Sequence, residues 1–335
     1  MAIRGLGINY DTGFFPGGKN SRPLFDPAAV RRDMGVIARD LHCRAVRVSG
    51  GDPERLSVAA TAARAEGLEV WFAPFPCELG DQELRQMLAE SADRAAAASS
   101  DVLVLGCEMS LFCRGFLHGD TVYDRIALLT SGNIGGHGIE DRPGEIERSV
   151  NELLAQVSSD ARRRFPGRVT YASGIWERID WTPFDIVAVD AYRDESTEAF
   201  YPDMIDRLVT KAAGFGKPFA VTEFGCCTYE GAAGRGGMGW DIADETADPP
   251  RVKGAYRRSE AEQSTYLTEL LATFDEHGVD SAFWFTFATF GAVHSDEPAQ
   301  DLDLGAYGLV KMLDDERWEP KEGFHALAAE YAKRS

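Results

Sequence analysis

The sequence predicts a (β/α)8 barrel, an α/β fold in which eight parallel strands alternate with outer helices. Apolar runs of strand length recur along the chain and alternate with segments of helical periodicity. Capping residues mark the starts of several of these helices. The length of 335 residues suits one α/β barrel, and no linker or low-complexity run divides the chain. We therefore expect residues 1–335 to form a single barrel domain.

The first half of the chain repeats a strand–helix unit. The expected strands are residues 3–9, 43–49, 68–73 and 102–106. Asp26 precedes Pro27, which suits the first position of a helix, and Asp52 precedes Pro53 in the same way. Asp81 is expected to cap the third helix. This repeated order predicts a parallel sheet.

The second half continues the pattern. The expected strands are residues 168–172, 185–190, 218–222 and 281–286, and the expected helices are 145–164, 204–212, 259–278 and 321–333. Ser259 and Glu262 have the spacing of a capping box, and Gly278 ends that helix. The segment 174–184 is too short for a full outer helix.

Long loops are expected after the fourth, seventh and eighth strands. Loops of this length in a compact domain usually carry function. The glycine-rich segments 132–138 and 231–240 are expected to be either lids over a ligand or plain surface loops. Trp240, at the end of the second segment, is a candidate for substrate binding.

Composition narrows the class of partner. The chain has 54 acidic against 35 basic residues, a formal net charge of −19 that repels nucleic acid and anionic membranes. No apolar run is long enough to span a bilayer, and the first residues do not resemble a signal peptide. We expect a cytoplasmic protein that binds a small molecule, while its oligomeric state stays open.

The cysteines and histidines do not indicate a metal site. Six cysteines are too sparse for a disulfide framework, so reduced thiols are expected. Cys226 and Cys227 could supply a nucleophile or a metal thiolate, or they could be packed thiols. The chain has no C-x-x-C, H-x-H or H-E-x-x-H pattern and no GK[ST] phosphate loop. We expect no metal and no cofactor.

Two glutamates follow apolar strands. Glu108 ends the fourth strand and Glu223 ends the seventh, so both are expected on the face where barrel enzymes place their chemistry. Two carboxylates on either side of a glycosidic bond can divide the work of hydrolysis between a proton donor and a nucleophile or base. The alternative is that each glutamate is a solvated or ion-paired surface residue.

A barrel with these strand-end glutamates resembles clan A of the retaining (β/α)8 glycoside hydrolases. The resemblance implies that Glu108 in GCEMS is the acid/base and Glu223 in TEFG the nucleophile. It implies that Arg47 in RVSG and Tyr192 in DAYRD bond the nucleophile. It also implies that a sugar stacks on Trp284 in AFWFTF.

Each of these three residues also has a plainer interpretation. Arg47 could hold a carboxylate in its charged form or pair with any surface acid. Tyr192 could donate its hydroxyl to Glu223 or simply pack against a loop. Trp284 could offer a flat face to a ring or belong to the core.

Cys107 departs from the clan A pattern, which usually has Asn before the fourth-strand glutamate, where it bonds the sugar 2-hydroxyl. A thiol is a weak donor. The departure implies that the substrate lacks that hydroxyl or that the reaction is not ordinary glycoside hydrolysis. The opening GINYDTG and the segment HCRAVRVSGGDPERL also resemble uncharacterised proteins labelled abortive-infection proteins.

Three functions remain open from the sequence. The first is a retaining, glycoside hydrolase-like enzyme acting on a small glycoside or glycosylated metabolite. The second is an acid/base isomerase, cyclase or lyase that uses the same glutamate pair on a metabolite that is not a sugar. The third is a non-catalytic barrel that binds a carbohydrate or a protein.

Overall fold

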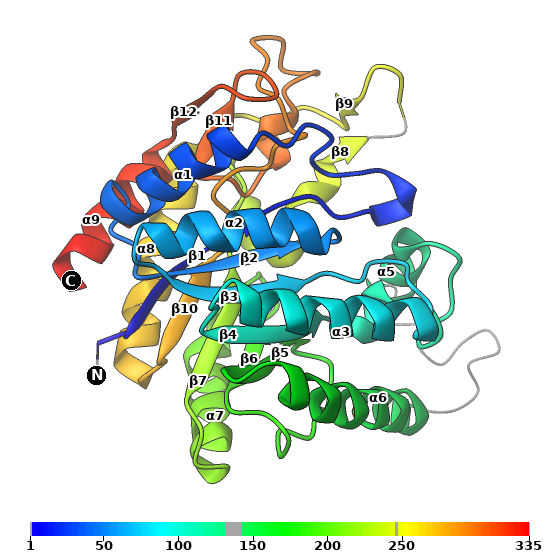
Figure 1. Cartoon of the computed structure of the whole chain (residues 1–335). Helices are drawn as coiled ribbons and strands as arrows, with labels where there is room; N and C mark the ends of the chain where they lie inside the picture. Colours follow the sequence, from blue (N-terminus) through cyan, green and yellow to red (C-terminus); the bar gives the residue numbers. More distant parts are fainter. Residues whose placement is uncertain (1, 131–142, 245–246, 335) are drawn as a thin grey trace.

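The computed structural model describes residues 2–130, 143–244 and 247–334. Eight parallel strands close into a barrel in the order β1-β10-β7-β6-β5-β4-β3-β2 (Figure 1). These strands are β1 (Gly5–Asp11), β2 (Ala45–Gly50), β3 (Glu69–Pro74), β4 (Val102–Cys107), β5 (Arg168–Gly174), β6 (Val187–Asp190), β7 (Phe219–Phe224) and β10 (Ser281–Trp284). Each overlaps a predicted strand, so the predicted barrel is confirmed.

The outer layer consists of helices that follow the strands. They are α1 (Pro27–Arg39), α2 (Pro53–Ala65), α3 (Asp81–Ala97), α6 (Pro143–Arg164), α7 (Tyr201–Gly214), α8 (Glu260–His277) and α9 (Glu322–Arg334). Asp26 and Asp52 cap α1 and α2 as predicted, because their carboxylates accept from backbone N–H groups of the first turns. Gly278 ends α8 with φ +77°, also as predicted. Residues 175–186 form turns and bends instead of a helix.

The prediction that Asp81 caps α3 is wrong. Gly80 occupies the cap position, and Glu83 accepts a hydrogen bond from the Gly80 backbone N–H at 3.3 Å. Asp81 is the first helical residue, and its carboxylate pairs with Arg85 one turn later at 2.8 Å. An acidic side chain in the first turn still favours the helix through its dipole.

The long loops contain structure of their own. They carry η1 (Pro16–Gly18), α4 (Met109–Phe112), α5 (Val122–Thr130), η2 (Glu198–Phe200), η3 (Ala232–Ile242), η4 (Leu302–Gly305) and the hairpins β8 (Ala243–Asp244) with β9 (Arg251–Val252) and β11 (Val310–Met312) with β12 (Trp318–Pro320). Both termini lie on the opposite side of the molecule from α5 and β8 (Figure 1). The predicted lid at 132–138 lies outside the described residues.

Apolar side chains fill the barrel interior. Alternate residues of the strands point inward, among them Trp71, Val104 and Phe283. Gly7 makes room for Phe283, because a Cβ at Gly7 would lie 2.3 Å from its ring. This packing closes the barrel below the site, so any ligand must bind above these residues at the carboxyl ends of the strands.

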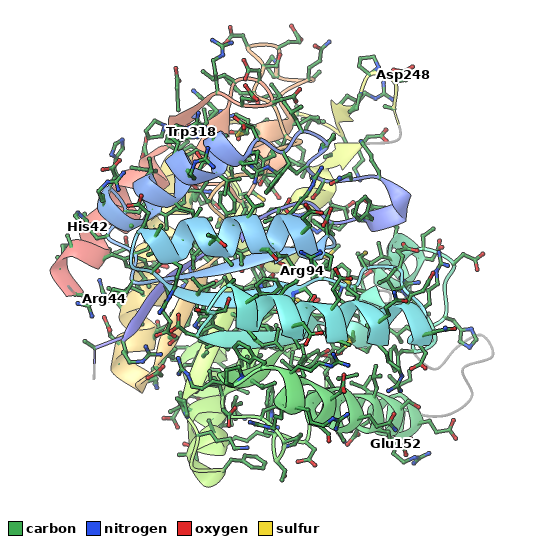
Figure 2. All side chains as sticks on the ribbon, in the orientation of Figure 1. His42, Arg44, Arg94, Glu152, Asp248 and Trp318 are labelled. Atoms are coloured by element: carbon green, nitrogen blue, oxygen red, sulfur yellow. The ribbon has the colours of Figure 1, made fainter. Side chains whose placement is uncertain are left out.

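A second apolar layer lies between the barrel and its helices, while charged side chains such as Arg94 and Glu152 extend from the outer helices (Figure 2). All six cysteines are buried and unbridged, which confirms the expected reduced thiols. Within the described part of the chain, no helix has the length and apolarity that a bilayer span requires.

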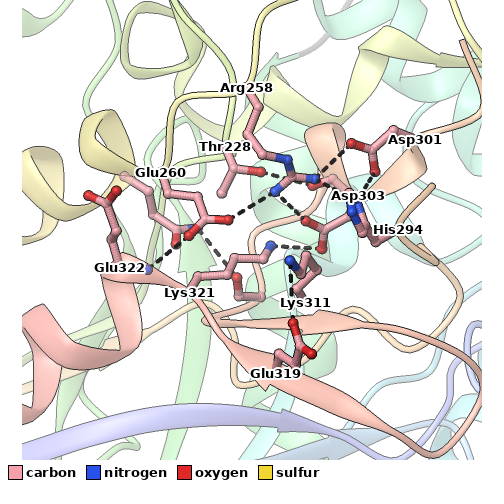
Figure 3. Close-up of polar contacts among 12 residues, drawn as sticks. Thr228, Arg258, Glu260, His294, Asp301, Asp303, Lys311, Glu319, Lys321 and Glu322 are labelled. Carbon is pink, nitrogen blue, oxygen red and sulfur yellow. Dashed lines mark hydrogen bonds and ion pairs between the residues drawn. The ribbon is translucent and has the colours of Figure 1, made fainter. Parts of the chain in front are cut away.

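A buried ionic network joins the loops after β7 and β10 (Figure 3). Asp303 in η4 is its centre: it pairs with Lys321 at 2.8 Å and with Arg258 at 2.9 Å, and its backbone carbonyl accepts from Thr228. Arg258 also pairs with Asp301 at 2.8 Å. The Lys321 and Asp303 side chains are 0% and 1% exposed, so the network fixes these loops with little screening by water.

We expect Lys321→Met to lower the free energy of unfolding by about 3–5 kcal/mol, because it leaves the Asp303 charge buried with one partner fewer. Lys333→Met is the matched control, since Lys333 is 67% exposed and its ion pair with Glu330 should be worth about 0–1 kcal/mol. Urea unfolding of both variants measures the difference. Equal losses in the two variants would contradict a structural role for the network.

Candidate active site

Arg47 is the buried cation of the barrel mouth. It points into the barrel because it lies two residues after Ala45, an inward residue of β2. Its side chain is 1% exposed. Asn9 is its register partner on β1, and the side-chain oxygen Oδ1 of Asn9 accepts from Arg47 Nη1 at 2.8 Å. The Asn9 amide donates to the Thr222 backbone carbonyl at 2.9 Å, which fixes Arg47 against the seventh strand.

Glu223 points inward only because β7 is irregular at its end. Val221 and Phe224 belong to the outer apolar layer and Ala220 to the barrel interior. Val221 and Phe224 both point outward, so two residues, Thr222 and Glu223, separate them where regular alternation would have one. The register with β6 shifts at this point. Such bulges re-aim side chains next to active sites. The shift brings the Glu223 carboxylate into the barrel mouth.

The Glu223 carboxylate accepts hydrogen bonds on both oxygens. Arg47 Nη1 lies 2.6 Å from Oε1, and the Tyr192 hydroxyl donates to Oε2 at 3.0 Å. Burial and the Glu223 charge raise the pKa of Tyr192 well above 10, so the phenol keeps its proton and acts as a donor. Glu223 is thereby held in one orientation, with its side chain 14% exposed.

Cys107 also reaches the interior through a register shift, near Gly106 with φ +85°. Its thiol donates to Asp190 at 3.3 Å and lies 3.7 Å from Glu223 Oε1. The thiol is therefore already engaged with a carboxylate. Asp190 is 3% exposed, and its other oxygen has no hydrogen-bond partner.

Cys107, Asp190 and Glu223 place one ligand atom each within 4.8 Å of one another, a spacing that a metal ion could use. One feature opposes a cation there. Arg47 already lies 2.6 Å from Glu223 and would repel a second positive charge. Burial and the charge of Asp190 raise the pKa of the Cys107 thiol well above 9.

Glu108 lies at a sharp turn between β4 and α4, with φ +42°. Glu177, on the turn after β5, holds this turn. Its carboxylate accepts from the Ser110 backbone N–H at 3.0 Å and from the Tyr171 hydroxyl at 2.8 Å. Tyr171 in turn accepts from the Met109 backbone N–H at 2.6 Å. The two N–H groups that follow Glu108 are thus fixed by buried partners, which keeps the strained backbone in place.

Glu108 faces the other carboxylates of the mouth. Burial raises its pKa well above 4.5, and the charges of Asp190, Glu223 and Glu177 raise it further, while Arg47 opposes them. A carboxyl group whose pKa is raised in this way is suited to give a proton to a bound molecule. The separation of about 5–5.5 Å between Glu108 and Glu223 that a retaining pair would have stays a prediction.

Trp284 does not lie where the resemblance implies. It is 0% exposed, its ring packs edge-on against Phe224 at 5.3 Å, and its indole N–H donates to the Tyr307 backbone carbonyl. Strand alternation is the reason: Phe283 points inward, so Trp284 points outward, toward the helices. Stacking of a sugar on Trp284 is therefore contradicted. Phe285, the next residue, is half-buried beside Tyr192 at 6.5 Å between ring centroids.

Trp240 lies in the loop after β7, at the edge of the barrel opening. It lies in η3, where the Gly239 N–H donates to the Tyr307 hydroxyl at 2.9 Å. The Tyr307 ring is 5.9 Å from Tyr192. Cys226 and Cys227 are packed thiols, 1% and 0% exposed. Burial raises the pKa of both thiols, which does not favour a nucleophilic role.

Several residues of the mouth were not singled out from the sequence. Asn9, Asp190 and Phe285 follow the inward alternation of their strands, so a strict period of two would have found them. Glu177 sits in a turn without a recognisable motif, and nothing in the sequence indicates its bonds to the turn after Glu108.

No protein-family model matches the chain, and no curated protein sequence matches it either. Solved structures, in contrast, superpose on the whole chain. The GH113 β-mannanase AaManA from Alicyclobacillus acidocaldarius in complex with ManMIm superposes with a TM-score of 0.63 at 16% identity, covering 100% of this chain and 99% of that one. The β-glycosidase BGL167 gives 0.54 at 13% identity, covering 99% and 97%. An FMN-binding β-glucuronidase from Facaelibacterium prausnitzii gives 0.59 at 13%, covering 99% of this chain but 44% of its own.

The chain has the (β/α)8 barrel fold of these glycoside hydrolase structures. At these identities the likeness establishes the barrel fold and no activity. The predicted resemblance to clan A is confirmed at that level. The resemblance to abortive-infection proteins and the cytoplasmic location stay predictions.

We expect the free energy of unfolding of Asp190→Asn, relative to that of the wild type, to increase as the pH rises from 4 to 8. Burial and the Glu223 charge raise the pKa of Asp190 well above 3.8, so its contribution to stability is present at low pH and lost as the pH rises toward the folded-state pKa. Asparagine does not titrate. Urea unfolding at several pH values tests this, with exposed Asp315→Asn as control; a difference independent of pH would contradict it.

Proposed function

We propose that the protein is a retaining, glycoside hydrolase-like enzyme that acts on a small glycoside or glycosylated metabolite. The observation that carries the proposal is the Glu223 carboxylate, bonded by Arg47 and Tyr192 and flanked by Glu108. One carboxylate is held ready to attack, and the other favours its protonated form. Environments that separate two carboxyl groups in this way divide nucleophile from acid.

The proposed reaction has two steps. In the first, Glu223 attacks the anomeric carbon while Glu108 gives its proton to the departing oxygen, which leaves a glycosyl ester on Glu223. In the second, Glu108, now ionised, takes a proton from a water molecule, and that water releases the sugar and restores both groups. Arg47 and Tyr192 orient Glu223 in the first step and stabilise its departing charge in the second.

The solved structures of the same fold support this class of substrate. They include a β-1,4-mannanase, a β-glycosidase and a β-glucuronidase, all of which act on glycosides. The residues that we propose to line the substrate site are Arg47, Tyr192, Cys107, Trp240 and Phe285, the last in place of Trp284.

Asp190 favours a second candidate. A third buried carboxyl group beside Glu223, hydrogen-bonded to the Cys107 thiol, offers an additional proton donor or acceptor. An acid/base isomerase, cyclase or lyase on a metabolite that is not a sugar could use three such groups. The two candidates differ in one respect, because only the hydrolase forms a glycosyl ester on Glu223.

We expect Glu223→Gln to abolish hydrolysis of 4-nitrophenyl glycosides and Glu108→Gln to lower kcat/KM by about 10²–10⁴-fold for alkyl glycosides. The loss in Glu108→Gln should be smaller for 4-nitrophenyl glycosides, because a good leaving group needs less help from an acid. Glu230→Gln is the control, since Glu230 pairs with Arg257 on the surface.

Circular dichroism establishes that each of these variants is folded. Full activity in both folded active-site variants would contradict the roles proposed here. Wild-type protein that hydrolyses none of the glycosides would favour the second candidate.

A further inference from the structure

An aromatic contact spans the barrel mouth. Tyr123, in the loop after β4, lies with its ring centroid 6.2 Å from that of Trp240, in the loop after β7. These are the strands that carry Glu108 and Glu223, and only β5 and β6 lie between them in the strand order. The contact therefore joins the two loops that follow the strands of the carboxylate pair.

The loop that carries Tyr123 is anchored to the turn after Glu108. Arg125, 0% exposed, donates to the backbone carbonyls of Gly119 at 2.9 Å and Phe112 at 3.2 Å, and also to that of Leu111. A fully buried guanidinium with these partners holds α5 against α4. Tyr123 is thus carried on a fixed support.

The loop that carries Trp240 is anchored beside Glu223. The Tyr307 hydroxyl donates to the Gly236 carbonyl at 2.6 Å and accepts from the Gly239 N–H at 2.9 Å. A Cβ built on Gly237 would lie 3.4 Å from the Tyr192 ring, so the loop backbone lies directly on the residue that bonds Glu223. Both ends of the aromatic contact therefore adjoin the catalytic carboxylates.

The β1–β4 side of the mouth is closed by packing. Glu78 accepts from the Gly17 N–H at 3.3 Å and from the Val122 N–H at 2.7 Å, which ties the loops after β1, β3 and β4 together. Three rings of the same loops pack edge to face, with centroids 4.9 Å apart for Phe14 and Phe75 and 4.7 Å apart for Phe75 and Phe112. This side offers no path for a polymer chain.

The segment that follows β5 carries exposed apolar side chains. Ile175 and Trp176 are 49% and 39% exposed, although both follow directly on a barrel strand. The Trp176 indole N–H donates to the Ser110 hydroxyl at 3.2 Å, so the exposed ring lies beside Ser110, which follows Glu108 by two residues in the sequence. An exposed tryptophan face is suited to an apolar or ring-shaped group.

We infer that the leaving group enters on the β5 side, over Trp176, and that the site takes a single terminal glycosyl unit. This inference rests on the proposed hydrolase function. A site roofed between its two carboxylates and packed on one flank cannot receive an internal segment of a polysaccharide, because a chain laid across the mouth would have to pass through these contacts.

The test compares oligosaccharides with free and blocked ends. The glycosyl residue is the one whose 4-nitrophenyl glycoside turns over fastest in a panel. The probes are its linear tetrasaccharide and the same tetrasaccharide with a bulky group on the terminal unit. We expect the wild type to release single units from the free probe and to cleave the blocked probe at least about 10²-fold more slowly, since the reacting centre cannot be placed correctly.

Tyr123→Ala combined with Trp240→Ala should restore part of the cleavage of the blocked probe, while Phe215→Ala, which removes an exposed ring next to α7, should not. Internal cleavage of the blocked probe by the wild type at the rate of the free one would overturn this inference and leave the hydrolase proposal standing. No turnover of any glycoside would overturn both.

Discussion

The buried ion pair between Arg47 and Glu223 is the interaction on which the site depends. A guanidinium that is 1% exposed requires an anion, and Glu223 supplies it at 2.6 Å. Removing one partner of such a pair typically costs about 3–5 kcal/mol, because the other charge stays buried alone. The strands that meet at the barrel mouth are therefore held in register by the same carboxylate that we propose as the nucleophile.

The charges around this pair assign different states to neighbouring acids. Three carboxyl groups, Glu108, Asp190 and Glu223, share a mouth in which Arg47 is the cation that bonds Glu223. Arg47 and Tyr192 both donate hydrogen bonds to Glu223. Burial and the neighbouring charges raise the pKa of Glu108 and Asp190. The division of labour that we propose between Glu108 and Glu223 follows from these positions.

Much of the architecture could be predicted because strand and helix signals are local. Apolar runs, the Asp-Pro starts of α1 and α2 and Gly278 gave the barrel and most of its boundaries. Glu108 and Glu223 could be selected because strand ends of a barrel meet at one face. Their orientation could not, because it depends on bulges before Cys107 and Glu223 that interrupt the period of two.

The expectation for Trp284 failed for a related reason. The resemblance to clan A implied a sugar platform there, yet regular alternation after Phe283 turns Trp284 into the outer apolar layer. The support from Glu177 to the turn after Glu108 and the contact between Tyr123 and Trp240 join residues far apart in sequence. Interactions of this kind depend on how loops pack in three dimensions, and no local motif encodes them.

Covalent trapping tests directly whether Glu223 is the nucleophile. A panel of activated 2-deoxy-2-fluoro glycosides is incubated with the protein, which is then digested and analysed by mass spectrometry. We expect time-dependent inactivation and one glycosyl adduct on the peptide that contains Glu223, with no adduct in Glu223→Gln. Steady turnover of glycosides without an adduct, or an adduct on Glu108, Cys107 or Asp190 instead, would contradict it.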